Sequence, residues 1–158
     1  MTVEEVIKHF ELQPLTMEGG YFRQNYRSSE VTPERKPMGT AIYYLLTPDT
    51  FSRLHKLPTD EVYHFYLGDP VELLLLYPDG TGKKVILGKE IEKGMEVQFA
   101  VPAGIWQGSR LAFGGNWALL GTTMAPGFTD EDFIPARPEA LKEKYPRFIS
   151  EIENLTGL

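Results

Sequence analysis

Eight short runs rich in β-branched and aromatic residues follow one another between residues 21 and 124, and turn residues separate nearly all of them. Among the separators, residues 47–49, 78–82 and 114–116 favour tight turns or permit positive φ. Strands spaced this evenly predict an all-β sandwich or a small closed barrel rather than a parallel α/β sheet. The predicted strands cover residues 21–27, 40–46, 51–57, 62–67, 72–77, 84–87, 96–101 and 117–124.

Helical periodicity is confined to the two ends of the chain. Thr2 followed by Glu5 forms a capping-box signature, and apolar residues then recur at helical spacing, which predicts a short N-terminal helix. From residue 138 a second amphipathic pattern begins, and Pro146 is expected to break or restart it. Its predicted apolar face consists of Leu141, Tyr145, Phe148, Ile149, Ile152 and Leu155.

The chain has the length and composition of one ordinary globular domain. Its 158 residues are 42% hydrophobic, and no repeat or linker divides them. We therefore predict a single domain over residues 1–158, with a barrel core over about residues 20–133 and C-terminal helices over about residues 138–156.

Charge and composition exclude several classes of protein. The net charge of −6 is the wrong sign for a nucleic-acid-binding protein, and the absence of cysteine removes disulfides, thiolate metal sites and a cysteine nucleophile. The N-terminus lacks the features of a signal peptide, and the longest apolar stretch, residues 41–46, is too short to span a bilayer. We expect a cytoplasmic protein with neither a nucleic acid nor a membrane as its partner.

The residue types that carry chemistry gather in residues 55–68, which read H-x-L-x-x-x-E-x-x-x-x-x-x-G and hold two of the three histidines. If His55 points inward, strand alternation also places Leu57 inward, and a turn through residues 58–60 can return Glu61 beside His55 on the next strand. A second element, residues 102–107, reads P-x-G-x-x-Q and would bring Gln107 to the same space.

These two elements resemble the paired motifs of the cupin superfamily. Cupins carry H-x-H-x-x-x-E-x-x-x-x-x-x-G and P-x-G-x-x-H, whose three histidines and one glutamate bind a divalent metal. His55, Glu61 and Gly68 match that pattern, whereas Leu57 and Gln107 stand at the other two histidine positions. The resemblance therefore keeps the spacing of the metal motif and half of its ligands.

Further matches narrow the resemblance to the small single-domain family known as cupin type five. They are residues 17–23, 60–65, 68–70, 101–107 and 126–128, followed by Asp132 and Phe133. The resemblance implies a double-stranded β-helix, that is, a jelly-roll cupin barrel, which is commonly a homodimer. It also implies similarity in shape to the metal-independent sugar-nucleotide 3,5-epimerases.

We predict acid–base roles for three residues. His55 would abstract a proton next to a carbonyl, Glu61 would orient the imidazole, and Tyr21 or Tyr63 would return the proton or stabilise the enolate. The structural alternative for His55 and Glu61 is a buried ion pair that stabilises the barrel.

Six residues are candidates for ligand binding: Glu18, Arg23, Tyr63, His64, Trp106 and Gln107. Arg23 would hold a carboxylate or phosphate, or else form a salt bridge with Glu18 or another acid. Trp106 would form a stacking wall or pack in the core. Alternation places Glu61 and Tyr63 on one face of their strand and His64 on the other, so that His64 enters the pocket only if a bulge shifts the phase.

Three functions are compatible with these residues. The first is an isomerase or epimerase that binds a small oxygenated molecule such as a sugar derivative and requires no cofactor. The second is an enzyme in which His55, Glu61 and Gln107, with or without His64, hold a divalent metal. The third is a non-catalytic protein that binds a small molecule in the same pocket.

Overall fold

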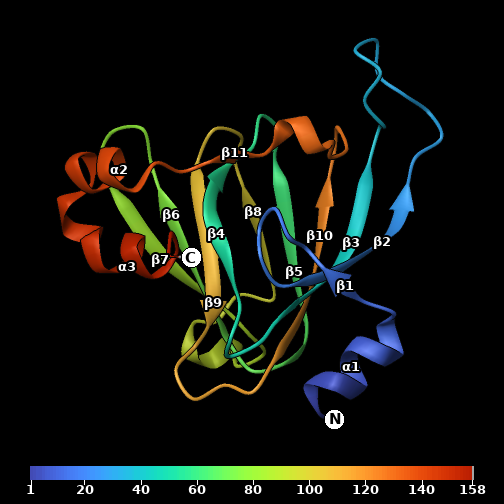
Figure 1. The fold of residues 1–158 in the computed structure, drawn as a ribbon, viewed down its shortest axis with the longest axis horizontal. Coiled ribbons are helices and arrows are strands. Elements are labelled where there is room, and N and C mark those ends of the chain that lie inside the picture. Colours follow the sequence, from blue (N-terminus) through green and yellow to red (C-terminus); the bar gives the residue numbers. More distant parts are fainter. Residues whose placement is uncertain (158) are drawn as a thin grey trace.

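The computed structural model describes residues 1–157. In it, two antiparallel β-sheets face each other and enclose the core (Figure 1). The six-stranded sheet has the order β1 (Gln13–Pro14), β2 (Tyr21–Arg27), β3 (Thr40–Leu46), β10 (Ala118–Met124), β5 (Glu61–Gly68) and β8 (Gln98–Val101). The five-stranded sheet has the order β11 (Ile134–Pro135), β4 (Phe51–Lys56), β9 (Trp106–Leu111), β6 (Val71–Leu76) and β7 (Gly82–Leu87). Strands distant in sequence are neighbours in both sheets, and the predicted double-stranded β-helix is confirmed.

Three strands were not predicted. β9 has the sequence WQGSRL, which lacks β-branched residues, and becomes a central strand because it pairs with β4 on one side and β6 on the other. β1 and β11 are two-residue pairings at the sheet edges, shorter than any periodic signal can reveal.

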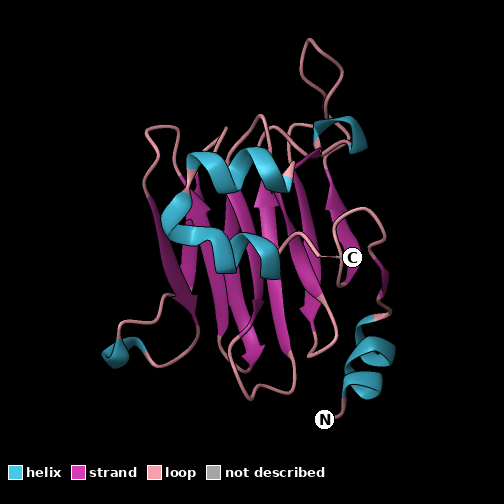
Figure 2. Ribbon diagram, turned by 60° about the vertical axis from the view of Figure 1, so that its left-hand side comes forward, coloured by secondary structure: helices cyan, strands magenta, loops and turns pink. Residues whose placement is uncertain are grey.

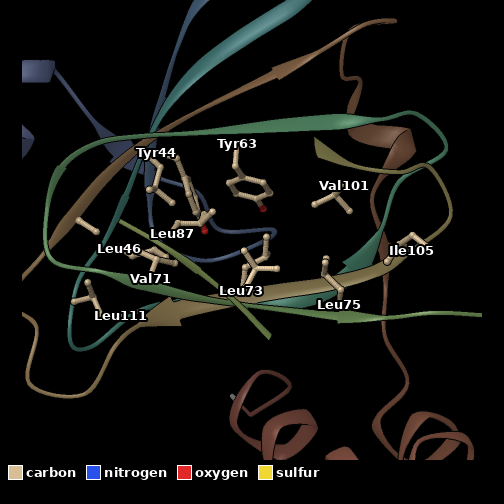
Figure 3. Packing of buried hydrophobic residues seen from close by; sticks show 13 residues of the cluster. Tyr44, Leu46, Tyr63, Val71, Leu73, Leu75, Leu87, Val101, Ile105 and Leu111 are labelled. Carbon is tan, nitrogen blue, oxygen red and sulfur yellow. The ribbon is translucent and has the colours of Figure 1, made fainter. Parts of the chain in front are cut away.

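The core between the sheets is built from inward-facing side chains of both. Figure 3 shows Tyr44 and Tyr63 on one side of this core and Leu73 and Leu75 of β6 on the other. All four residues of the run Leu73–Leu76 are buried, because its even-numbered members pack on the outer side of the sheet instead. A strand covered on both faces needs no polar alternation.

Helix α1 (Val3–Phe10) covers part of the outer face of the six-stranded sheet. Its predicted capping box is present, since Thr2 Oγ1 accepts from the Glu5 amide and the Glu5 side chain accepts from the Thr2 amide. Val6 packs with Leu45 of β3 and Leu119 of β10 in a small separate cluster.

The C-terminal helices α2 (Pro138–Lys144) and α3 (Ile149–Asn154) lie across the outer face of the five-stranded sheet (Figure 2). The helix breaks at Tyr145, before Pro146, and restarts through the 3-10 turn η3 (Pro146–Phe148), as predicted. Ile149 is an exception to the predicted apolar face, because it is exposed. No helix within residues 1–157 is long and apolar enough to cross a membrane.

Candidate functional site

A cavity of about 580 Å³ opens into the space between the two sheets. Its deep end is polar and is formed by Glu18, His55, Glu61 and Thr122, which we call the polar floor. Its sides are mainly apolar, and we call the following residues the apolar walls: Leu15, Phe22, Ile42, Leu57, Phe128 and Phe133. A cavity of this size suits a small molecule.

A β-bulge in β4 places His55 in this cavity. The pairing between β4 and β9 shifts by one residue between Ser52 and His55. Ser52 and His55 therefore both face inward although three positions separate them, because a bulge adds one residue and changes the phase of the strand. The His55 side chain is 1% exposed.

The surroundings of His55 determine which ring nitrogen faces the cavity. Its Nδ1 lies 2.6 Å from the carbonyl oxygen of Arg53, which can only accept, so Nδ1 carries the proton. Phe133 stacks on the ring with the two centroids 4.8 Å apart. Burial lowers the pKa of His55, against the opposing effects of Glu61 and the Arg53 carbonyl. In the neutral ring, Nε2 is then a free acceptor.

Glu18 reaches the polar floor from the turn before β2. Gly19 and Gly20 both adopt positive φ, and a Cβ on Gly19 would collide with the Phe51 carbonyl oxygen. Two glycines therefore let this turn lie directly against β4. The Arg53 amide donates to the Glu18 carbonyl, and Ser52 Oγ donates to Glu18 Oε1 at 2.5 Å.

Glu18 is the acid directly opposite His55. Its Oε1 lies 3.9 Å from His55 Nε2, and its side chain is 17% exposed. Burial raises the pKa of Glu18 to about 7, and the hydrogen bond from Ser52 opposes that rise. Near neutral pH this carboxyl therefore exists in both protonation states.

Glu61 enters the polar floor from the first position of β5. Burial and then the charge of Glu18 raise the pKa of Glu61 to about 7, while His55, Thr122 and Gln107 oppose the rise. Its Oε1 is buried without a hydrogen-bond partner among the described residues. A buried carboxyl oxygen without a partner is available to a ligand.

The predicted relation between His55 and Glu61 needs a correction. We expected them on adjacent strands, but β4 and β5 belong to opposite sheets, so the two residues approach each other across the interior. The imidazole is oriented by the Arg53 carbonyl and by Phe133, not by Glu61.

Tyr63 and Gln107 lie beneath the cavity rather than in its lining. Both are 1% exposed, and the Tyr63 hydroxyl donates to Gln107 Oε1 at 3.0 Å. Burial, and then the charges of Glu61 and Glu18, raise the pKa of Tyr63 above its ordinary value. This pair supports Glu61 from below.

His64 does not enter the cavity. It faces the outer side of the six-stranded sheet, where its Nε2 lies 3.0 Å from Thr123 Oγ1 and its Nδ1 lies 3.2 Å from Gln98 Nε2. No register shift separates it from Glu61, so regular alternation holds.

Tyr21 and Trp106 also point away from the cavity, so the catalytic role predicted for Tyr21 is withdrawn, and of the two alternatives for Trp106 the structure has core packing. Tyr21 pairs in register with the outward-facing Leu45 and packs in the cluster beneath α1. Trp106 precedes the inward-facing Gln107 on β9 and therefore packs on the opposite face, against the C-terminal helices.

Arg23 lies at the rim of the cavity and is already paired. Its Nη1 donates to Glu11 Oε2 at 2.9 Å and to the Phe10 carbonyl at 3.3 Å. Of the two predicted alternatives, the structure has the salt bridge, with Glu11 rather than Glu18 as the acid.

Strand and helix periodicity did not predict one wall of the cavity. Residues 126–133 cross its opening and contribute Phe128 and Phe133. The Phe128 amide donates to Thr40 Oγ1, and the Asp132 carboxylate forms a 2.5 Å ion pair with Lys36. Phe133 was part of the motif resemblance, but only the fold brings it against His55.

The residues present do not fit the metal that the cupin motif implies. Leu57 replaces one histidine, and Gln107 Oε1 is engaged by the Tyr63 hydroxyl. No group of three or more His, Cys, Asp or Glu side chains within residues 1–157 is arranged to hold a metal ion. We therefore assign no metal to this site.

Comparison with known proteins finds a matching family model and a sequence relative. Residues 4–135 match the family model Cupin_5, described as Cupin superfamily (DUF985). The chain is 31% identical to the uncharacterized protein YML079W of Saccharomyces cerevisiae over 146 residues, which cover 81% of this chain and 69% of the yeast protein.

Two solved structures match over almost the full length. The crystal structure of protein SO0799 from Shewanella oneidensis is similar with a TM-score of 0.92 and 31% identity, covering 99% of this chain and 98% of that one. A hypothetical protein from Leishmania major has a TM-score of 0.90 and 30% identity, covering 99% of both chains.

Proposed function

The chain belongs to the Cupin_5 (DUF985) family of the cupin superfamily, and from that premise we propose that its cavity binds a small oxygenated molecule and moves a proton on it, as an isomerase or epimerase does. One observation carries this proposal. The unprotonated Nε2 of His55 faces the cavity 3.9 Å from the carboxyl of Glu18, whose pKa is raised to about 7. A base and an acid matched to neutral pH are the equipment of proton transfer.

His55 is the base in this proposal. Its Nε2 accepts a proton from the carbon next to a substrate carbonyl, and the electron pair of the broken C–H bond forms an enolate. Because the Arg53 carbonyl holds Nδ1–H, the ring cannot present its other nitrogen to the cavity.

The two carboxyls supply the acid. When one of them is protonated, it can donate to the enolate oxygen while the other remains an acceptor, because the charge of Glu18 disfavours a second charge on Glu61. The carboxyl hydrogen-bonds the enolate oxygen and keeps its proton until the carbon is protonated. Return of the proton from His55 to the same carbon gives exchange without net change, whereas delivery from protonated Glu18 to the other face of that carbon inverts it, as an epimerase does. Proton exchange with water then restores neutral His55 and protonated Glu18. Glu18 thus takes the role first assigned to Tyr21 or Tyr63.

Hydrogen–deuterium exchange tests this function. The protein is incubated in deuterium oxide with a panel of small ketones and keto-sugars, and loss of the proton signal beside each carbonyl is followed by NMR. We expect exchange of at least one compound by the wild type, and its loss in His55→Gln and Glu18→Gln.

Exchange at the wild-type rate in His55→Gln would contradict the proposed function. A compound that binds in the cavity and returns without exchange would favour the second candidate, a non-catalytic binding protein. The unpartnered Oε1 of Glu61 supports that candidate as well, because it offers an acceptor to any hydrogen-bonding ligand.

A further inference from the structure

The cavity divides into a polar end and an apolar body. Three titratable side chains, Glu18, His55 and Glu61, gather in the polar floor with Thr122 beside them. Above them the apolar walls come from both sheets, from the turn before β2 and from residues 126–133. At the rim, the exposed lining residues Glu11, Gln13, Gln24, Arg27 and Asp130 are polar as well. Below that rim, hydrogen-bonding groups are therefore concentrated at the floor, and the apolar walls lie between the two.

The apolar walls discriminate against a polyhydroxylated ligand. Each hydroxyl of a sugar that enters the cavity loses water, and it needs a new hydrogen-bond partner to offset that loss. Leu57, Ile42 and Phe133, which line the cavity together with His55, offer no such partner. The same side chains gain from contact with a hydrocarbon body.

The polar floor also discriminates against an anionic head group. Among the described residues that line the cavity, the Lys and Arg side chains are Arg23 and Arg27 only, and both belong to the rim. Arg23 is neutralised by Glu11, and Arg27 is exposed to solvent. A carboxylate or phosphate at the floor would face Glu18 and Glu61 without a cation to balance its charge.

We propose that the substrate of this site is an uncharged carbonyl compound with an apolar body, bound with its carbonyl at the polar floor and its hydrocarbon part along the apolar walls. The proposal rests on the proposed function and narrows it. It replaces the sugar derivative that the family resemblance suggested with a ketone or aldehyde whose oxygen atoms are confined to one end.

Three probe compounds test separately whether the site excludes an anionic head group and whether it excludes a polyhydroxylated body. Benzylacetone is neutral with an apolar body, phenylpyruvate has a similar body but a carboxylate beside its carbonyl, and fructose is neutral but polyhydroxylated. Binding of each to the wild-type protein is measured by calorimetry, and exchange of its α-protons is followed by NMR in deuterium oxide.

We expect benzylacetone to bind at least about tenfold more tightly than either of the other probes. The variant Leu57→Asn places an amide in the apolar wall and should reduce the difference in affinity between benzylacetone and the other two probes. His64→Gln, on the outer face, should leave that difference in affinity unchanged. Thermal unfolding of both variants confirms that each is folded; if Leu57→Asn is not, Ile42→Thr replaces it.

The outcomes separate this proposal from the function on which it rests. Binding of benzylacetone without exchange would end the proposed catalysis and leave the ligand class standing. Exchange of fructose that depends on His55, with weaker or no binding of benzylacetone, would support the proton transfer and overturn the ligand class. Tighter binding of phenylpyruvate than of benzylacetone, or no saturable binding of benzylacetone up to its solubility limit, would also overturn it.

Discussion

His55 and His64 lie in one sequence motif, yet the structure places His55 inside the barrel and His64 on its outer surface. His55 faces the interior, with Nδ1 held by the backbone and Nε2 open to the cavity. His64 faces outward, and both of its ring nitrogens are occupied, by Thr123 and by Gln98. A residue type and its spacing indicate a candidate, but the face of the strand decides whether that candidate can do chemistry.

The same contrast separates other residues of like type. Glu18 reaches the polar floor, whereas Glu11 lies on the surface with its side chain 75% exposed. Gly19 lets Glu18 approach β4, whereas Gly94 has the same sign of φ in open space. Each inner residue therefore has an outer counterpart that can serve as its control.

The largest effect is expected from the histidine pair. His55→Gln should lower the rate of substrate proton exchange by at least about 100-fold, because a general base typically contributes at least that factor to the rate. His64→Gln should stay within about twofold of the wild type, since its side chain does not reach the cavity. NMR in deuterium oxide with an exchanging carbonyl compound measures both rates. Equal losses in the two variants would show that the inner and outer faces do not differ in the way we describe.

The next largest difference is expected between the stabilities of two glycine variants, one at Gly19 and one at Gly94. Gly19→Ala should lower the free energy of unfolding by about 3 kcal/mol or more, because it combines a positive φ with a collision against the Phe51 carbonyl oxygen. Gly94→Ala meets nothing within 4 Å and should cost about 1 kcal/mol from its φ alone. Urea unfolding of both variants gives the two values. Similar losses would mean that the turn before β2 relaxes away from β4 at little cost.

Glu61, compared with the exposed Glu11, tests the electrostatics of the polar floor. The pKa of Glu61 rises from its ordinary value of 4.5 to about 7 on folding, so between these values the native protein holds a proton that the unfolded chain releases. Stability contributed by this group therefore falls as the pH rises through that window. Glu61→Gln removes the titration and should become more stable than the wild type by about 3 kcal/mol above the window, with little difference below it.

Urea unfolding of the wild type and Glu61→Gln at about pH 5 and about pH 8 measures this change. The control is Glu11→Gln, whose exposed ion pair with Arg23 should change the free energy of unfolding by less than about 1 kcal/mol. A gain in Glu61→Gln that is the same at both pH values would indicate a packing effect and not the titration of a buried acid.

Local patterns were sufficient to predict most of the fold. Strand composition and turn residues located all the long strands except β9, and alternation along a regular strand predicted that Glu61 and Tyr63 share one face and His64 lies on the other. The cupin resemblance supplied what alternation could not, the closure of the strands into two facing sheets. Residues that lie near each other in the sequence were thus the ones whose geometry could be predicted.

The parts that escaped prediction depend on contacts between distant segments. Phe133 reaches His55 only because residues 126–133 fold back over the cavity, and Tyr21 turned outward because α1 covers its side of the sheet. The bulge that turns Ser52 and His55 to the same side follows from the pairing of β4 with β9. No local pattern encodes such a pairing, because the partner strand lies about 50 residues away.

The serine pair next to that bulge gives the smallest and most specific test. Ser52 and Ser109 are partners on adjacent strands, and both are fully buried, but Ser52 donates to Glu18 while Ser109 Oγ has no partner. Ser52→Ala should therefore cost about 1 kcal/mol and Ser109→Ala close to nothing, because only the first removes a hydrogen bond. Ser52→Ala should also raise the pKa of Glu18 further, since the hydroxyl opposes its rise, and carbon-13 NMR of the Glu18 carboxyl measures that shift. An unchanged Glu18 titration in Ser52→Ala would mean that the bulge positions His55 alone, and that the acid opposite it is held only by its backbone.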